Sequence, residues 1–399
     1  MNTSSNNIYD VAVIGGGPSG TTLANYLRKS CKKKIKLLII DKESFPRSKV
    51  CGDGIGRGTA ALLAEMQLDQ LLSQYNPIMN VMIHGPGNSF AEMKIPKNST
   101  ESLGGYVIPR IELDNTLFSL ATTLGAESRC NRKFIKAVFD DSSSLWNIHL
   151  LNTSNKNEEI VRSRILIGAD GARSRVRKIL GVPFNTPENE GIAIRYYCKT
   201  KIPHGDTIRF YFNKELLPGY GWIFPIDKNM ANIGIIIDLK QYESQNSNLN
   251  EMMTHFIRNV NENVHLPINE CNYESFILPY SSQLPKLSYK SAALLGDAAS
   301  MINPFTGEGI YYGMYAGKIL GQLLGNAINE KRNLQNALDN YEKLFLDKFK
   351  KHIKWTMVLK RICTYPVLIN FIINKILNTK SVFDKLNSTT NIFPKIQQN

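Results

Sequence analysis

The sequence has no long apolar run and no closely spaced pair of cysteines. No stretch of about 18 apolar residues occurs in its 399 residues, which disfavours a membrane-spanning helix. The N-terminal residues are polar and lack the apolar centre of a secretory signal. We therefore expect a cytoplasmic protein. The cysteines form no C-x-x-C pair, which argues against a structural zinc site and a disulfide framework, so we expect no metal. They are Cys31, Cys51, Cys130, Cys198, Cys271 and Cys363.

Acidic residues are outnumbered, with 34 Asp and Glu against 48 Lys and Arg, for a net charge of +14. Residues 331–399 hold 13 Lys and Arg and 4 Asp and Glu. Such a tail fits an anionic phospholipid surface, nucleic acid, or an ordinary solvated helix surface. No recognition motif accompanies it, so we expect no nucleic-acid partner.

Within this tail, a basic run at Lys348–Lys354 precedes apolar runs between Trp355 and Leu377. Lys360, Arg361, Pro366 and Lys375 interrupt those apolar runs. The pattern suits a helix lying in a membrane interface, and hence peripheral association with the inner face of a membrane. An amphipathic helix packed on the protein's own core is the alternative.

A glycine-rich motif near the N-terminus indicates nucleotide binding. Gly15–Gly20 reads G-x-G-x-x-G, directly after a predicted buried strand (8–14) and before a predicted helix. Glycines there permit a tight turn and bring backbone amides close to a pyrophosphate at the helix N-terminus. The next predicted strand ends at Asp41, where a carboxylate can accept a ribose hydroxyl. The order of these features predicts a dinucleotide.

Two further segments favour FAD over a nicotinamide cofactor. Leu166–Ser174 reads as a strand and turn with Asp170 at the strand's end. Leu295–Ala299 and Asn303–Ile310 form a second strand, loop and helix start, in which Asp297 can accept from ribityl hydroxyls. Amides at a helix start can stabilise negative charge on a reduced flavin. A nicotinamide cofactor has no ribityl chain and needs no third segment.

The predicted fold class is α/β with an α+β insert. It combines a Rossmann-type FAD-binding domain with an inserted antiparallel β-rich substrate domain and a helical C-terminal segment. The predicted FAD-binding domain comprises residues 1–75, 105–185 and 286–330. The β domain comprises 76–104 and 186–285, and the basic helical segment comprises 331–399.

Glycines recur every four residues along the last predicted helix of the FAD-binding domain. They are Gly309, Gly313, Gly317, Gly321 and Gly325. Each costs about 1 kcal/mol relative to alanine inside a helix. We interpret the stripe as structural, offset by close backbone contact with another element.

The three cofactor segments resemble the flavoprotein group that contains para-hydroxybenzoate hydroxylase, which implies that Arg110 lies beside the flavin diphosphate or ribityl chain. Phe45–Ile55, with Lys49-x-Cys51-Gly52, and Leu217–Pro225, with Gly-Trp-x-Phe-Pro, resemble the geranylgeranyl reductase family. The forms Cys-Gly-Asp-Gly and Pro-Gly-Tyr-Gly-Trp look most similar to its bacterial menaquinone-type members.

This second resemblance implies reduction of carbon–carbon double bonds in a polyprenyl lipid or quinone side chain. Because hydride addition alone would leave an unstabilised carbanion, a proton donor is needed. Cys51 is the main candidate, with Asp53 and Tyr211 as weaker ones. The reductant is expected to be NAD(P)H or a ferredoxin-like donor, since only one dinucleotide motif is present. The alternative is a flavin monooxygenase or halogenase with an aromatic or natural-product substrate.

The remaining site expectations concern binding. Alternation on two strands predicts an aromatic wall for an apolar chain, or else ordinary sheet core, made of Phe210, Phe212, Tyr220, Trp222 and Phe224. The residues expected at the cofactor are Gly15, Gly17, Pro18, Ser19, Gly20, Asp41, Lys42, Arg47, Cys51, Gly52, Arg110, Asp170, Gly296, Asp297, Pro304, Gly307, Gly309 and Ile310.

Overall fold

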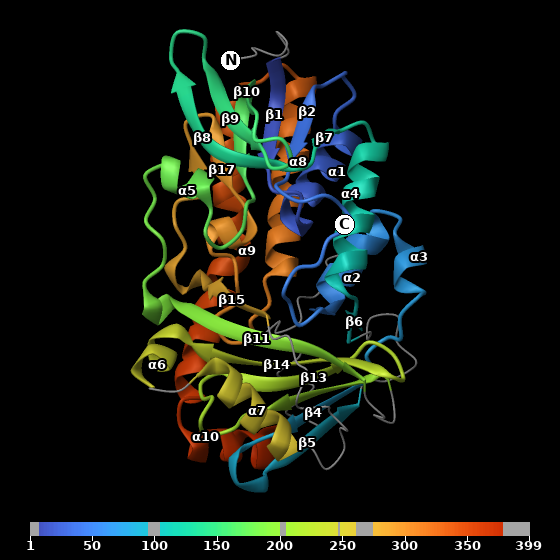
Figure 1. The fold of residues 1–399 in the computed structure, drawn as a ribbon, viewed down its shortest axis with the longest axis vertical. Coiled ribbons are helices and arrows are strands. Elements are labelled where there is room, and N and C mark those ends of the chain that lie inside the picture. Colours follow the sequence, from blue (N-terminus) through green and yellow to red (C-terminus); the bar gives the residue numbers. More distant parts are fainter. Residues whose placement is uncertain (1–7, 95–103, 200–204, 246–247, 261–273, 378–399) are drawn as a thin grey trace.

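Two large sheets, one above the other, organise the chain (Figure 1). The structure is a computed structural model that describes residues 8–94, 104–199, 205–245, 248–260 and 274–377. Its mixed architecture confirms the predicted α/β class with a β-rich insert. Cys271 and residues 378–399, which the sequence predictions included, lie outside the described residues.

The upper sheet contains eight strands and a parallel centre. Its main path runs β16-β17-β10-β1-β2-β7, and β9 joins β10 to β8. Strands β8 and β9 form an antiparallel hairpin. The strands are β1 (Ile8–Ile14), β2 (Leu37–Ile40), β7 (Glu127–Arg129), β8 (Arg132–Asp140), β9 (Leu145–Asn152), β10 (Glu158–Gly168), β16 (Ser288–Tyr289) and β17 (Ala292–Leu294). Its four central strands are almost fully buried where they pair, as expected of a parallel sheet covered on both faces.

Helices pack around the upper sheet and join it to the lower one. They are α1 (Pro18–Ser30), α2 (Arg57–Glu65), α3 (Asp69–Leu72), α4 (Arg110–Thr123), α5 (Arg175–Ile179) and α8 (Ile310–Asn329). A short pair of strands, β3 (Gly54–Ile55) and β6 (Tyr106–Val107), lies between the two sheets. A 3-10 turn, Gly296–Ala299, follows β17.

The lower sheet has seven strands in the order β15-β11-β14-β13-β12-β4-β5. They are β4 (Asn80–His84), β5 (Phe90–Lys94), β11 (Glu190–Lys199), β12 (Thr207–Tyr211), β13 (Tyr220–Pro225), β14 (Met230–Asp238) and β15 (Glu274–Pro279). Helices α6 (Leu239–Ser244) and α7 (Leu249–Val260) accompany it. The predicted antiparallel pairing holds for every neighbouring pair in this sheet except one, because β4 pairs with β12 in parallel. The β4–β5 hairpin is far from β12 in sequence, so no hairpin turn fixes their relative direction.

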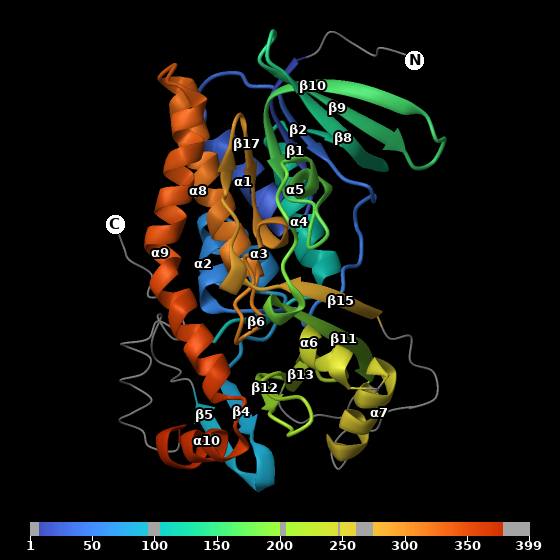
Figure 2. The same cartoon turned by 90° about the vertical axis from the view of Figure 1, so that its left-hand side faces the viewer.

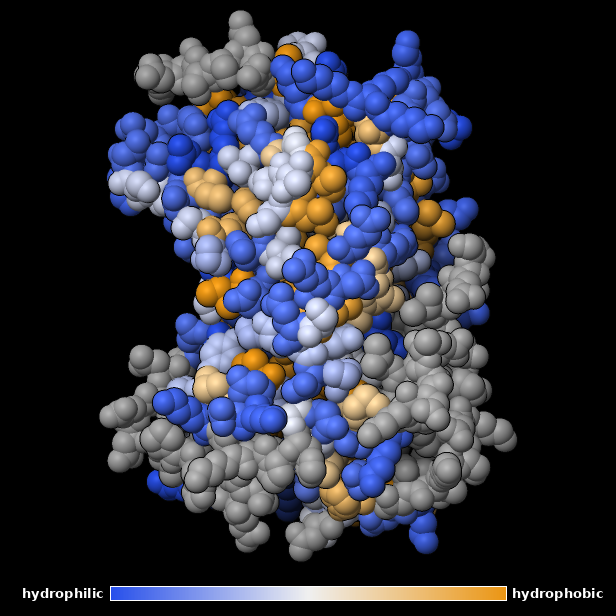
Figure 3. Space-filling view, turned by 90° about the vertical axis from the view of Figure 1, so that its right-hand side faces the viewer, coloured by the Kyte–Doolittle hydropathy of each residue, from blue (hydrophilic) through white to orange (hydrophobic). Residues whose placement is uncertain are grey.

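A long helix connects the two levels of the molecule. Helix α9 (Leu334–Ile362) runs down one side past both sheets, and α10 (Pro366–Phe371) lies at its lower end beside β4 and β5 (Figure 2). The Tyr341 hydroxyl donates to the Leu294 carbonyl at 2.9 Å in the upper level. Lower down, the Lys360 ammonium lies 2.6 Å from Asp238, at the end of β14. In space-filling view the outline narrows between the two levels (Figure 3).

The glycine stripe of α8 explains how this helix approaches α1. A Cβ on Gly317 would lie 2.6 Å from the Ser19 carbonyl oxygen, and one on Gly321 would lie 2.6 Å from that of Leu23. Both contacts are with backbone, which cannot rotate away. The structural interpretation of the stripe is therefore confirmed.

We expect Gly321→Ala to lower the free energy of unfolding by about 1–3 kcal/mol, because overpacking against the Leu23 carbonyl outweighs the gain in helix propensity. Asn326→Ala, on the exposed side of the same helix, is the matched control and should change stability by less than about 0.5 kcal/mol. Chemical denaturation measures both. Stabilisation by Gly321→Ala would contradict this account of the helix contact.

Candidate functional site

The predicted cofactor segments meet at one edge of the upper sheet. Strands β1, β2, β10 and β17 are parallel, so their carboxyl ends lie together. The glycine turn follows β1, Asp41 follows β2, Ala169–Gly171 follows β10 and Gly296 closely follows β17. In open α/β sheets, ligands bind outside these strand ends, where neighbouring connections diverge. The arrangement brings together Gly15 and Gly296, which are 281 residues apart in sequence.

The glycine turn is shaped by close backbone contacts. Gly15 has a φ of 109°, and a Cβ there would lie 2.1 Å from the Ala169 carbonyl oxygen. A Cβ on Gly20 would lie 2.2 Å from the Gly15 carbonyl oxygen. Gly17 differs, since its Cβ would meet only Arg47, at 3.6 Å. Gly15 and Gly20 are therefore required by the protein's own packing, whereas Gly17 leaves space for a ligand at the start of α1.

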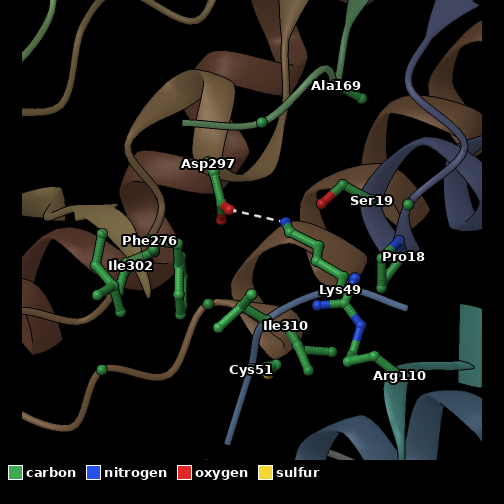
Figure 4. Close-up of a pocket in the computed structure, with 16 residues that line it drawn as sticks. Pro18, Ser19, Lys49, Cys51, Arg110, Ala169, Phe276, Asp297, Ile302 and Ile310 are labelled. Carbon is green, nitrogen blue, oxygen red and sulfur yellow. Dashed lines mark hydrogen bonds and ion pairs between the residues drawn. The ribbon is translucent and has the colours of Figure 1, made fainter. Parts of the chain in front are cut away.

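A cavity extends from this turn towards the lower sheet. One end is formed by Gly17, Pro18 and Ser19 at the N-terminus of α1. Figure 4 shows Arg110 and Cys51 on one side and Asp297, Phe276 and Ile302 on the other. The remaining wall residues are Lys49, Val50, Ala169, Gly171, Leu278, Gly307, Gly309 and Ile310. The cavity is thus polar near the glycine turn and more apolar near the lower sheet.

A buried charge cluster holds Arg110 at the cavity wall. Its guanidinium donates two hydrogen bonds to Asp114, at 2.6 and 2.7 Å, while Arg47 approaches the same carboxylate at 3.2 Å. Arg47 also stacks on the Phe45 ring. Arg47 also lies 3.9 Å from Asp41, so two arginines face two carboxylates. The cluster therefore has no excess of charge, but it holds guanidinium donors in place for an anionic ligand such as a diphosphate.

Asp41 lies where the ribose prediction placed it, at the end of β2. Its carboxylate accepts the Gly16 amide at 2.8 Å and the Glu43 amide at 3.0 Å. It is 92% buried. A carboxylate has about four acceptor positions, so these two bonds leave capacity for a ribose hydroxyl.

Lys49, to which the sequence analysis gave no role, crosses the cavity. Its ammonium lies 3.2 Å from Asp297, shown as a dashed line in Figure 4. This pair links the loop before Cys51 to the turn after β17. Lys49 and Arg110 line the same cavity. Two cationic side chains at this wall are consistent with an anionic cofactor.

Cys51 lines the cavity, and its loop is fastened to the lower sheet by Asn232. The Asn232 amide donates to the Cys51 carbonyl at 2.7 Å and to Asp53 at 2.8 Å, and its oxygen accepts from the Trp222 indole at 3.0 Å. Burial raises the pKa of the Cys51 thiol, while the Arg110 guanidinium opposes that shift. The thiol therefore keeps its proton at neutral pH.

Asp53 is fully buried and has a φ of 61°, a left-handed conformation that disfavours non-glycine residues. The Tyr197 hydroxyl donates to its carboxylate at 2.5 Å, and the Arg110 amide does so at 3.3 Å. Burial raises the pKa of Asp53, and the hydrogen bonds from Tyr197 and Asn232 oppose that shift. Asp53 thus connects the Cys51 loop to β11 and β14, which supports a positioning role for this weaker catalytic candidate.

Tyr197 and Asn232 were missed by the sequence analysis. Asn232 does carry a signal, because it is a polar residue within an otherwise apolar run, residues 230–237, of β14. A polar side chain buried in such a strand needs hydrogen-bond partners, so its presence indicates a contact with another element. Its partners were not visible, since they lie 10 to 181 residues away.

Four predicted residues are corrected. Tyr211 lies on the opposite face of β12, stacked on His84 at 4.5 Å and against Phe256, because alternation turns it away from Phe210. Asp170 accepts hydrogen bonds from the Ser174 hydroxyl and the amides of Arg175 and Val176. Its carboxylate therefore caps α5, and only its neighbours Ala169 and Gly171 line the cavity.

The third is Lys42, which is exposed and lies 3.9 Å from Glu43, away from the cavity wall. Its long side chain is solvated rather than aimed at a cofactor. Pro304 is buried in the loop before α8 and also does not line the cavity. The other predicted residues of that loop, Gly307, Gly309 and Ile310, do line it.

The predicted aromatic residues form one packed cluster on the upper face of the lower sheet. Phe210 contacts Tyr220 and Phe224 with ring centroids 5.4 and 5.3 Å apart, and Trp222 lies between those two. The Tyr220 hydroxyl donates to the Thr306 carbonyl at 2.5 Å, next to the cavity. Phe212 lies 5.9 Å from Tyr220. The cluster thus borders both the Cys51 loop and the loop before α8.

Glu308, also missed, lies on the loop before α8. Burial raises the pKa of its carboxyl to about 7, while hydrogen bonding by the Gly56 backbone opposes the shift. Tyr220, Tyr311 and Tyr312 lie close enough for the charge on Glu308 to raise their pKa values. The cavity therefore has a carboxyl behind it that titrates near neutral pH.

The cavity residues fit FAD. The slot at Gly17 and the amides of α1 match a pyrophosphate. Arg110 and Lys49 line the same cavity as cationic hydrogen-bond donors, and Arg47 lies beside Gly17. Asp41 matches a ribose, and Asp297 a ribityl chain. The amides that begin α8 and the apolar residues near Cys51 match a flavin ring.

Comparison with known proteins agrees with this geometry. A family model described as FAD binding domain matches residues 8–356. The chain is 30% identical over 321 residues to a menaquinone reductase of Mycolicibacterium smegmatis, covering 76% of this chain and 73% of that protein. It is 26% identical over 403 residues to a digeranylgeranylglycerophospholipid reductase of Thermoplasma acidophilum, covering 97% of each.

A solved structure shares the fold over almost the whole chain. It is a geranylgeranyl bacteriochlorophyll reductase-like protein of Thermoplasma acidophilum, with a TM-score of 0.81, 23% identity and 96% of each chain covered. The chain therefore belongs to the FAD binding domain family, among relatives that include geranylgeranyl- and menaquinone-type reductases, and is an FAD-dependent oxidoreductase.

Proposed function

We propose that this protein reduces carbon–carbon double bonds of a polyprenyl chain, carried by a geranylgeranyl lipid or by a menaquinone. The observation that carries the proposal is the contact between the Cys51 loop and the aromatic cluster around Trp222. The apolar end of the cavity, at Phe276, Leu278 and Ile302, offers surface for an isoprenoid chain beside the cofactor. Burial stabilises such a chain by about 25 cal/mol per Å² of apolar area.

The protein's own residues account for orientation and proton delivery. Bound FAD, once reduced by an external electron donor, would supply a hydride to one alkene carbon and return to its oxidised form. The other carbon needs a proton, and the Cys51 thiol holds one at the cavity wall because burial raises its pKa. Asn232 fixes the backbone of Cys51, and Arg110 lies beside the thiol. The thiolate formed would regain its proton from solvent, so each reduction adds one hydride and one proton to the double bond.

The electron donor is part of the same proposal. We expect NAD(P)H or a ferredoxin-like protein to reduce the bound flavin from outside, because the sequence contains a single dinucleotide motif. The substrate is expected to reach the site from the cytoplasmic face of a membrane. A hydroxylase or halogenase remains the second candidate, because the fold is shared with that class.

The test is anaerobic turnover. Protein with bound FAD, reduced by dithionite, should convert a geranylgeranyl phospholipid or menaquinone to products heavier by one H₂ for each double bond. Cys51→Ala should lower the rate at least about 100-fold, because a positioned acid contributes that much or more. Cys31→Ala, remote from the cavity, is the matched control. Turnover that requires oxygen would favour the hydroxylase, and unchanged turnover in Cys51→Ala would remove Cys51 as the acid.

A further inference from the structure

Exposed apolar side chains concentrate on the C-terminal helices. Six of the ten large hydrophobic residues that are exposed in the described part of the chain lie between Trp355 and Phe371. They are Trp355, Val358, Tyr365, Val367, Leu368 and Phe371, with exposures from 42% to 77%. Isolated exposed apolar residues are ordinary, but a cluster of this kind marks an interaction surface. On the face in Figure 3, by contrast, the coloured apolar residues are scattered among hydrophilic ones.

Helix α9 carries two separate apolar faces. Phe345, Phe349 and Ile353 are buried against the rest of the protein. Leu344, Trp355 and Val358 are exposed, and with Lys348 and Lys351 they recur at intervals of four and three residues. That spacing places these five on one stripe of the helix, about a third of a turn from the buried face. Lys348 lies over the Tyr315 ring, whereas Leu344, Trp355 and Val358 of this stripe are exposed.

The exposed residues of α10 are held on a firm base. Ile369 and Ile373 face inward and form a buried cluster with Ala91, Leu217 and Cys363. The Ser89 hydroxyl bonds to the Asn370 side chain at 2.5 Å, fastening α10 to the β4–β5 hairpin. Val367, Leu368 and Phe371 are left pointing outward. The docking surface, defined as Trp355, Val358, Tyr365, Val367, Leu368 and Phe371, is thus presented by a packed element.

The surroundings of the docking surface are basic. No Asp or Glu occurs from Lys348 to Lys375, a stretch that holds seven Lys and Arg. Lys360 differs from the other basic residues of this stretch, because its side chain points inward to Asp238 and lies over the Tyr280 ring. This corrects the sequence interpretation that counted Lys360 among the interfacial charges. The exposed ones are Lys348, Lys350, Lys351, Lys354, Arg361 and Lys375.

No single helix among the described residues is long and apolar enough to cross a membrane. Leu334–Ile362 and Pro366–Lys375 meet that test only as a pair, bent by 109°. Aromatic and aliphatic residues bordered by lysines are the composition of surfaces that lie within a bilayer interface. Each Lys or Arg near an anionic leaflet contributes about 1 kcal/mol of attraction.

We propose that the docking surface binds the headgroup region of an anionic lipid bilayer. The composition of the surface indicates this occupant. Its apolar side chains match the acyl chains of a leaflet, and the basic residues around them match acidic headgroups. The proposal rests partly on the proposed function, since a polyprenyl substrate resides in the bilayer.

The same region leads towards the cofactor. The buried cluster beneath α10 packs against Phe212 and Phe305. Phe212 belongs to the aromatic cluster, and Phe305 to the loop that begins α8. An apolar chain leaving the bilayer at α10 would therefore meet continuous apolar side chains as far as the cavity.

Vesicle flotation of the FAD-bound full-length protein tests the proposal. We expect binding to vesicles containing phosphatidylglycerol, weaker binding to phosphatidylcholine alone, and a loss of binding as salt is raised. The double variant Val367→Ser/Phe371→Ser should bind at least about tenfold more weakly, because it removes buried apolar area. Val138→Ser, exposed on β8, is the matched control and should bind like the wild type. Flavin absorbance and thermal unfolding verify that each variant is folded.

Three results would overturn the docking proposal. They are failure of the wild type to bind anionic vesicles, equal binding by the double variant, and self-association of the wild type that the double variant abolishes. Reduction of a short, detergent-soluble isoprenoid separates this proposal from the proposed function. If that substrate is reduced while vesicles are not bound, only the docking proposal fails. If vesicles are bound and no isoprenoid is reduced, only the proposed reaction fails.

Discussion

Gly17→Val should abolish tight FAD binding while leaving the protein folded. Gly17 has φ −74° and ψ −179°, which valine can adopt, and a Cβ there would meet only the flexible Arg47 side chain. The added methyl groups would instead enter the cavity at the N-terminus of α1 and keep a pyrophosphate away from its amides. Loss of one hydrogen bond to a charged group costs about 1.5–3 kcal/mol, so losing two or more predicts at least about a 100-fold weaker affinity.

Fluorescence titration with FAD measures this effect, and Gly17→Ala should fall between the wild type and Gly17→Val. Thermal unfolding of the cofactor-free proteins is the control, and it should place both variants close to the wild type. Unchanged FAD affinity in Gly17→Val would mean that the diphosphate does not lie at this turn. A large loss of stability would instead show that Gly17, like Gly15, serves packing.

Asn232→Leu should be the most damaging substitution at the junction of the two sheets. It removes the hydrogen-bond partner of the Trp222 indole and that of the Cys51 carbonyl, and it takes one of three hydrogen bonds away from the buried Asp53 carboxylate. Each unsatisfied group costs about 1–3 kcal/mol, and relaxation makes the sum smaller than additive. We expect the free energy of unfolding to fall by about 3–5 kcal/mol. Turnover should fall as well, because the Cys51 loop loses its anchor.

A pair of tyrosine variants provides the matched control. Tyr197→Phe removes the 2.5 Å hydrogen bond to Asp53 and should cost about 1.5–3 kcal/mol. Tyr211→Phe removes the same hydroxyl on the other face of the sheet, where it should change neither stability nor turnover appreciably. Denaturant unfolding and steady-state rates distinguish these cases. Equal effects of the two tyrosine variants would contradict the network described around Asp53.

The parts of the site that the sequence predicted are local in the chain. A strand, a glycine turn and a helix lie within residues 8–30, and the chemistry of a tight turn determines which residues can occupy it. The glycine spacing of α8 also predicted a close helix contact, because glycines inside a helix lower its stability and a compensating contact is needed. The overall α/β class followed from the same alternation of apolar runs and turns.

The parts that the sequence missed depend on distant partners. Tyr197 and Asn232 reach Asp53 across 144 and 179 residues, and single-sequence patterns carry no information on such pairing. Asp170 was assigned to the cofactor because an acid at a strand end fits both a ligand and a helix cap. Lys360 was assigned to a surface because its burial depends on Asp238, which lies in another element. For Asp170 and Lys360, the sequence shows the residue type but not its partner.

The absorbance spectrum of the protein, purified under mild conditions and supplemented with FAD, tests the central claim most directly. The account predicts that the protein retains a stoichiometric yellow cofactor through gel filtration, with the visible bands of oxidised flavin that bleach on anaerobic reduction. A folded protein that stays colourless after incubation with excess FAD would contradict the assignment of the three strand-end segments to one flavin.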